Sequence, residues 1–243
     1  MPRKLPTEQE LVDFIVATHN CDHITLTHQD VTNTIKNTGV PSPYVQGHRK
    51  ALKYAVIDLC GSTDFPIRDI SMLSQDNVLT HLHWLTELHS MIMYPVAQAN
   101  LFSYAENNIS TSQCGTLRST SKALAFNMAP EPNIIPTLLF LWLKELATIN
   151  NEVKDNIDNP YGLTQYQAKR MGNFAKETPM FISCLQPFDN GNNLVARIVE
   201  NIIRINWYMP WKIINPGHQL DEFNKNLNIY QQTTFKEWLS KTK

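Results

Sequence analysis

The chain has 243 residues, and its 21 basic and 22 acidic side chains leave a formal net charge of −1. That length suits one large domain, or a domain with an extension. The balanced charge gives no electrostatic reason to expect nucleic acid or a membrane surface as a partner. The longest apolar run, residues 134–143, is too short to cross a bilayer, so no membrane span is expected.

The first ten residues are polar, and no apolar stretch follows them directly, so no secretory signal is expected. The four cysteines are far apart in the sequence and suggest neither a zinc site nor a disulfide framework. We therefore expect a cytoplasmic protein, in its own cell or in a host cell.

Helical patterns dominate the chain in order. Thr7 and Thr27 are expected to cap the first two helices, and a turn with two prolines follows at residues 39–43. Further helices are predicted at residues 48–60, 76–93, 133–149, 163–183 and 193–208. Residues 98–128 are mixed and suit a short hairpin, residues 150–160 suit a surface loop, and the tail from residue 216 is polar with one short helix near 235–239. The predicted class is mostly α.

One segment between two predicted helices carries a motif, Gln186-Pro-Phe-Asp-Asn-Gly-Asn-Asn-Leu-Val-Ala-Arg197. It resembles the Fic/Doc (Fido) signature His-Pro-Phe-x-Asp/Glu-Gly-Asn-Gly-Arg-x-x-Arg. The frame is kept at Pro187, Phe188, Gly191, Asn192 and Arg197. Four positions depart from it: Gln186, Asn190, Asn193 and Leu194.

Other stretches resemble Fic proteins in the same order, at residues 25–35, 51–55, 115–118 and 130–143. The resemblance implies a Fido fold, a helical bundle around a central motif helix with a short β-hairpin flap. It implies a Fic-like domain at residues 37–215, after an N-terminal inhibitory-type helical segment at 1–36 and before a polar C-terminal tail at 216–243. The flap would begin at Ser119, Thr120, Ser121 and Lys122.

Residues Thr18 to His23 resemble the inhibitory motif Ser/Thr-x-x-x-Glu-Gly/Asn of Fic proteins that have an N-terminal inhibitory helix. The resemblance implies that Asp22 pairs with Arg197, the second arginine of the signature. Aspartate is one methylene shorter than the family's glutamate, which leaves its reach open.

The departures fall on the groups that do chemistry in the family. Active Fic enzymes transfer AMP or another phosphate-containing group to a protein hydroxyl, with the signature histidine as general base. Gln186 stands at that position, and an amide cannot accept the proton, a loss that typically costs about 10²–10⁴-fold. Asn190 replaces the metal-binding carboxylate with a weak neutral ligand, and rescue of the metal site by Asp189 would need a different loop geometry.

The phosphate-binding part of the motif is only partly kept. Gly191, Asn192 and Asn193 would present backbone N–H groups at a helix N-terminus, with Arg197 as the remaining cation. Leu194 removes the other cation. Since phosphoryl-type transfer depends on positioned charge, these losses together argue against normal catalysis.

We therefore predict a pseudoenzyme of the AMPylating nucleotidyltransferase family that acts as a binding or regulatory module. The alternative is an active transferase of AMP or another phosphate-containing group that uses a non-standard base, so enzyme activity stays open. No cofactor is certain, and ATP and Mg²⁺ are expected only if activity or ATP binding is retained. An unidentified protein partner is expected, nucleic acid is not, and a nucleotide ligand and a homodimer stay open.

Several histidines and cysteines have plainer interpretations. His19, Cys21, His23 and His28 alternate in a way that could suggest a metal site, but solvated or partly buried polar side chains are the preferred interpretation. His89, on the helix predicted at 76–93, reads as an ordinary histidine at the helix surface or at the edge of the core.

Overall fold

The computed structural model describes residues 4–60, 74, 77–100, 109–123, 128–154, 156 and 162–242. Helices make up nearly all the regular structure of these residues, which confirms the mostly α class. Within the described part of the chain, strand pairing is limited to one antiparallel bridge between Ala123 and Met128. The bridge lies in the segment where a hairpin flap was predicted, and residues 124–127 of that flap lie outside the described residues.

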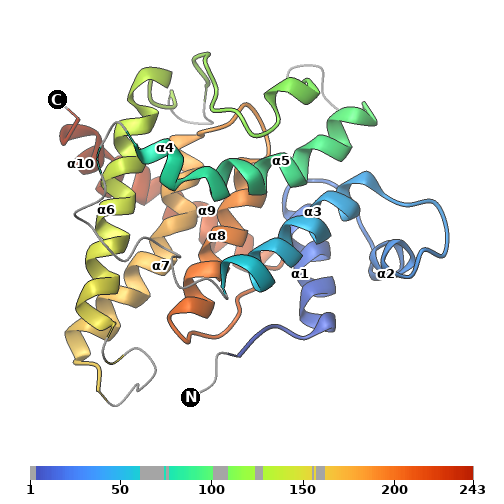
Figure 1. Cartoon of the computed structure of the whole chain (residues 1–243), viewed down its shortest axis with the longest axis horizontal. Coiled ribbons are helices and arrows are strands. Elements are labelled where there is room, and N and C mark those ends of the chain that lie inside the picture. Colours follow the sequence, from blue (N-terminus) through green and yellow to red (C-terminus); the bar gives the residue numbers. More distant parts are fainter. Residues whose placement is uncertain are drawn as a thin grey trace.

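The helices follow one another around a central helix, α8 (Figure 1). Their bounds are α1 (Glu8–Cys21), α2 (His28–Lys36), α3 (Pro43–Lys53), which continues into a π-helical segment (Tyr54–Leu59), α4 (Val78–His81), α5 (His83–Gln98), a 3₁₀ turn (Thr111–Gln113), another (Pro132–Ile134), α6 (Ile135–Val153), α7 (Gln165–Leu185), α8 (Asn192–Asn206), α9 (His218–Gln232) and α10 (Thr234–Ser240).

Helix α8 holds the centre because it is buried on almost every side. Nearly all of its residues are buried, including the run Ile198, Val199, Ile202, Ile203 and Ile205. It packs against α7 along much of its length and also contacts α5 and α1. A helix that is buried all round must be covered from several directions, which is why the motif at its N-terminus lies deep in the molecule.

The predicted helix starts agree with the structure where capping chemistry is strong. Thr7 and Thr27 each form a capping box, with Glu10 and Asp30 as the respective partners. Helix α3 begins five residues earlier than predicted, because Pro43 occupies its first turn, where the missing N–H costs nothing. The helix predicted at 76–93 is wrong as a single element: it is divided into α4 and α5 at Leu82.

The C-terminal segment holds more helix than expected. Helix α10 matches the predicted short helix, but α9 was not predicted, since residues 218–232 are mostly polar and Tyr230 alone among them is buried. Tyr230 lies near Phe235 of α10, with ring centroids 6.4 Å apart. The spacing of Leu220, Phe223 and Leu227 is the helical signal that could have identified α9.

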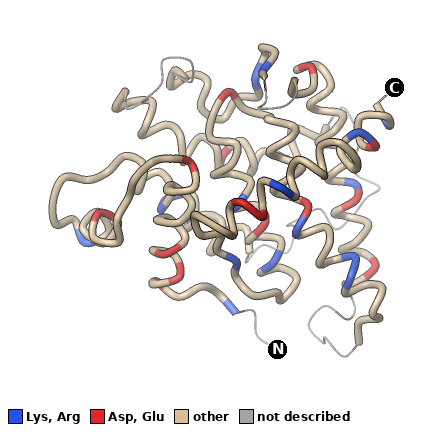
Figure 2. Tube along the Cα trace, turned by 180° about the vertical axis from the view of Figure 1, so that it is seen from behind, with Lys and Arg blue, Asp and Glu red and all other residues tan. Residues whose placement is uncertain are grey.

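One hydrophobic core joins residues from both ends of the chain, from Val12 and Phe14 of α1 to Phe235 of α10. Basic and acidic side chains alternate along the helices without a single-sign face in the view of Figure 2. Among the described helices, none combines the length and the apolarity that a bilayer crossing requires.

Candidate functional site

The motif loop connects α7 to α8 through two residues with left-handed backbone. Gln186 ends α7 at φ 49° and ψ 60°, a conformation that non-glycine residues adopt rarely. Gly191 precedes α8 at φ 72°, and a Cβ at this position would lie 2.6 Å from Sδ of Met93. The backbone angle therefore favours a glycine at 191, and a side chain there would also have to displace the end of the Met93 side chain.

Asn192 fixes the shape of the loop from inside. Its Oδ1 accepts a hydrogen bond from the Phe188 N–H at 2.9 Å, and its Nδ2 donates to the Phe188 carbonyl at 2.8 Å. Nδ2 also donates to Oε1 of Gln186 at 3.0 Å. The side chain is buried, so its amide serves the loop itself.

Arg118 ties the loop to the chain around the predicted flap. Its Nε donates to the Gln186 carbonyl at 2.6 Å, its Nη1 to Thr120 at 2.7 Å and its Nη2 to Pro130 at 2.5 Å. The Arg118 N–H donates to the Pro187 carbonyl at 2.9 Å. One buried guanidinium thus holds the end of α7 against both sides of the flap segment.

His89 of α5 packs against the motif loop and hydrogen-bonds to it, a role that the sequence did not reveal. Its Nδ1 accepts a hydrogen bond from the Gly115 N–H at 2.8 Å, so Nε2 carries the proton and donates to the Asn190 carbonyl at 3.0 Å. Its ring stacks on Phe188 with centroids 3.9 Å apart. Burial lowers the pKa of His89 to about 4, which keeps the imidazole neutral. The partners lie 26 and 101 residues away, so no local pattern could indicate them.

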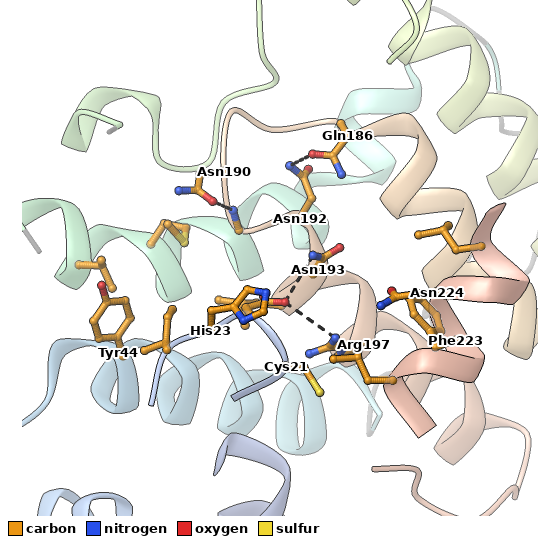
Figure 3. A pocket seen from close by; sticks show the side chains of 18 of the residues that line it. Cys21, His23, Tyr44, Gln186, Asn190, Asn192, Asn193, Arg197, Phe223 and Asn224 are labelled. Carbon is orange, nitrogen blue, oxygen red and sulfur yellow. Dashed lines mark hydrogen bonds and ion pairs between the residues drawn. The ribbon is translucent and has the colours of Figure 1, made fainter. Parts of the chain in front are cut away.

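A cavity of about 670 Å³ opens beside the loop, between the end of α1, the start of α8 and α9 (Figure 3). Most of the site residues predicted from sequence line it: Asp22, Lys122, Gln186, Asn190, Gly191, Asn192, Asn193 and Arg197. The other predicted flap residues Ser119, Thr120 and Ser121 do not line it. Ser121 instead donates to Glu131 at 3.0 Å. The site is thus built mainly by the residues at and just after the end of α1, the motif loop, α8 and α9, together with part of α5.

Gln186 faces the cavity with both ends of its amide engaged. Nε2 donates to the Ser183 carbonyl at 2.8 Å, while Oε1 accepts the hydrogen bond from Asn192. An amide has no basic lone pair to offer, and these bonds also hold it in place. Both polar atoms of the Gln186 amide therefore already have partners within the protein.

The residues at the metal position do not fit a magnesium ion. Oδ1 of Asn190 is turned back to its own loop and accepts from the Gly191 N–H at 2.7 Å. The Asp189 carboxylate accepts from Gln113 at 2.9 Å and does not line the cavity. Magnesium at phosphate sites is normally held by carboxylate oxygens, which the described lining does not supply at this loop.

The alternating histidines and cysteine of the N-terminal segment do not converge on a metal either. His19 contacts His48 at 3.1 Å between ring nitrogens, and His28 pairs with Asp13 at 3.0 Å. His23 lines the cavity. No group of three or more His, Cys, Asp or Glu side chains that could hold a metal occurs among the described residues.

Arg197 holds the C-terminal end of α1. Its Nη1 donates to the Thr18 carbonyl at 2.8 Å, while its Nη2 lies 3.8 Å from Oδ1 of Asp22. Asn193 also approaches Asp22, with 3.4 Å between Nδ2 and Oδ1. Burial raises the pKa of Asp22, and Arg197 only partly offsets this. The shorter aspartate therefore reaches ion-pair distance, whereas the backbone carbonyl is the closer partner of the arginine.

These distances predict that substitution of Arg197 lowers the free energy of unfolding more than substitution of Asp22 does. Asp22→Asn should lower the free energy of unfolding by less than about 1 kcal/mol, because a long ion pair that is costly to desolvate contributes little. Arg197→Met should cost about 2–4 kcal/mol, because it leaves the Thr18 carbonyl without its charged donor. Urea unfolding of both variants and of the double variant measures this. A coupling energy between the substitutions above about 2 kcal/mol would show that the ion pair, not the carbonyl, holds α1.

No family model and no curated protein matches this chain. Solved structures do match it. A Fic-domain signalling protein from Bacteroides thetaiotaomicron is 17% identical with a TM-score of 0.56, over 93% of this chain and 72% of that one. Fic-1 from C. elegans is 16% identical with a TM-score of 0.61, over 94% and 57% of the respective chains.

A Fic family protein from Desulfovibrio desulfuricans is 18% identical with a TM-score of 0.54, over 93% of this chain and 59% of that one. This chain therefore spans less than two thirds of the last two proteins. At such low sequence identities, the structural matches establish a shared fold alone. They confirm the architecture that the motif resemblance implied. The chain has the fold of Fic-domain proteins.

Proposed function

We propose that this protein is a catalytically silent binding or regulatory module built on the Fic fold. The observation that carries the proposal is the amide of Gln186, which is hydrogen-bonded at both ends and lies at the edge of a cavity of about 670 Å³. A general base is missing where proton transfer would occur, while the space for a ligand is kept. A cavity of this size is typical of sites for small molecules.

The charges around the cavity support the same conclusion. Arg197 is engaged by Thr18 and Asp22, and Lys122 donates to the Asp189 carbonyl at 2.6 Å. Leu194 provides an apolar surface at the position where the family has its other arginine. Transfer of a phosphate-containing group depends on cations aimed at the phosphates, and the cations of this lining already have partners in the protein.

The test is incubation of the protein with radiolabelled ATP, CTP, GTP or UTP and Mg²⁺ or Mn²⁺, alone and with cell lysate. We expect no label on the protein or on lysate proteins, while an active Fic enzyme labels its target under the same conditions. Gln186→His alone should also stay silent, because the carboxylate at position 190 is still missing. Label transfer that disappears in Gln186→Ala would contradict the proposal.

One observation favours the alternative, an active transferase with a non-standard base. His23 lines the same cavity and is labelled near Asn193 and Arg197 in Figure 3. An imidazole can act as a general base where an amide cannot. Label transfer that persists in Gln186→Ala but disappears in His23→Gln would establish this alternative and replace the silent module.

A further inference from the structure

Another cavity, of about 250 Å³, lies between α6, α7 and α10, and it shares no lining residue with the cavity beside the motif loop. Figure 1 shows these helices on the side of the molecule that holds the C-terminus. Ile149 of α6 and Phe174 of α7 are buried and give the cavity an apolar floor, and Trp238 of α10 adds a half-buried ring. Sites for whole small molecules usually start at about 300 Å³, so this cavity suits one long side chain.

The ring of Trp238 already carries a cation. Nζ of Lys241 lies 4.6 Å from the centroid of this ring, within the range in which the ring attracts an ammonium. The ring is held by Phe181, with centroids 5.3 Å apart. Lys241 follows the last residue of α10 and is exposed, so its side chain can leave the ring without disturbing the core.

The one arginine of this lining is neutralised by carboxylates. Arg170 forms an ion pair with Glu145 at 2.7 Å and a second one with Glu152. Two acidic groups thus surround one guanidinium, and Arg170 does not balance the other carboxylates of the cavity.

Two further carboxylates line the cavity beside the ring. Within the described part of the chain, neither Glu177 of α7 nor Glu237 of α10 forms an ion pair. Burial raises the pKa of Glu177; the adjacent Lys176, which does not line the cavity, opposes this rise, and Glu237 adds to it. Like charges that affect each other in this way favour a cation between them.

We propose that this cavity binds the side chain of a lysine from a partner protein. The aliphatic stem lies against Ile149 and Phe174, and the ammonium takes the place of Lys241 over Trp238. A primary ammonium has three N–H donors for Glu177 and Glu237, which a quaternary ammonium lacks. Lys241 is then a placeholder that the partner's lysine displaces.

This inference is independent of the motif cavity. It concerns other residues and another ligand, and it holds whether or not the protein transfers a nucleotide. The volume favours one side chain of a larger partner over a free small molecule, and the unpaired carboxylates give that side chain its charge.

The experiment is a nuclear magnetic resonance titration of the full chain that follows the indole N–H signal of Trp238, assigned by its loss in Trp238→Phe. The probes are the capped tripeptide Ala-Lys-Ala, the same peptide with norleucine or trimethyl-lysine in place of lysine, and free putrescine. We expect the lysine peptide to shift the signal saturably with a Kd of roughly 1 mM, as suits one side chain. The norleucine peptide, which has the same stem without the charge, should cause no saturable shift.

Substitutions identify the groups that contact the lysine. Glu177→Gln and Glu237→Gln should each weaken binding about threefold or more, because they remove a charged acceptor but keep its shape. Glu222→Gln, at an exposed position of α9 that lines neither cavity, should leave the affinity unchanged.

Lys241→Ala should strengthen binding about threefold, because it removes the cation that competes for the ring. Lys225→Ala makes the same change of charge on α9, outside both cavities, and should have no effect. Thermal unfolding shows whether each variant keeps the fold.

Several results would overturn the inference. They are equal shifts with lysine and norleucine, no saturable shift at about ten times the expected Kd, or unchanged affinity in both Glu177→Gln and Glu237→Gln. Tighter binding of the trimethyl-lysine peptide would contradict the role of the N–H donors, and tighter binding of putrescine would replace the partner protein with a free amine. Label transfer in the nucleotide assay would refute catalytic silence and leave this lysine site standing.

Discussion

The free energy of unfolding is expected to fall as the pH is lowered from about 6.5 towards 4, because the fold buries neutral histidines. His19 and His48 have no exposed surface, and Nδ1 of His48 lies 3.1 Å from Nε2 of His19. Burial, followed by the charge of Arg197, lowers the pKa of His19 to about 4. Burial, the neighbouring His19 and Arg197 lower the pKa of His48 as well.

The sign follows from proton linkage. The unfolded chain binds protons near the ordinary histidine pKa of about 6.5, whereas folded His19 and His89 resist protonation until about pH 4. Stability is therefore full above pH 6.5 and declines until the folded groups also titrate. For each of these two histidines the difference is worth about 3 kcal/mol, at 1.36 kcal/mol per pKa unit.

Urea unfolding between pH 7.5 and 5 measures the decline before most carboxylates titrate. His89→Gln should be less stable at pH 7.5 but should have a smaller slope against pH, since one resisting group is gone. His218→Gln, on the exposed start of α9, should keep the slope of the original chain. An unchanged slope in both His89→Gln and His19→Gln would show that these imidazoles do not govern the acid response.

Replacement of Arg118 by methionine is expected to destabilise the fold by roughly 3–5 kcal/mol, a large part of the stability of a typical domain. The guanidinium is buried and donates to the carbonyls of Gln186, Thr120 and Pro130. Methionine fills similar space but leaves these acceptors without a donor, and a buried unpaired polar group is costly. The motif loop and the chain on both sides of the predicted flap would lose their common tie.

Thermal and urea unfolding of Arg118→Met provide the measurement. Arg49→Met is the matched control, because Arg49 is exposed on α3 and should tolerate the change within about 0.5 kcal/mol. Arg118→Lys should recover only part of the loss, since one ammonium cannot reproduce the planar fork of donors. If the free energy of unfolding of Arg118→Met lay within about 1 kcal/mol of that of the original chain, the hydrogen bonds of Arg118 would not hold the loop in the way described.

The motif and the helices were predictable because their signals are local. Thr7 and Thr27 cap helices through residues three positions away, and the apolar spacing of α8 is visible within one segment. The motif frame around Gly191 depends on neighbours in sequence, and its left-handed backbone at φ 72° suits a glycine. Helix caps, apolar spacing and turn glycines can therefore be recognised in one sequence without knowledge of the tertiary structure.

The sequence could not predict side-chain contacts between residues that lie far apart in the chain. His89 appeared to be an ordinary histidine until the fold placed it under Asn190, and α9 appeared to be a polar tail until it was found along the cavity. The preference of Arg197 for the Thr18 carbonyl over Asp22 also depends on where α1 docks. Such contacts join residues that only packing brings together.

The sequence by itself determined the helical class, the Fic-like motif frame and the amides Gln186 and Asn190 at two of its positions, because these depend on residue identity and short spacing. The tertiary structure decided how that altered motif is held and what space remains beside it. The side chains of Arg118, His89 and Asn192 hydrogen-bond to the motif loop, and α9 lines one side of the cavity. Hydrogen-bond partners and cavity walls come from segments far apart in the chain, so only the packed fold could specify them.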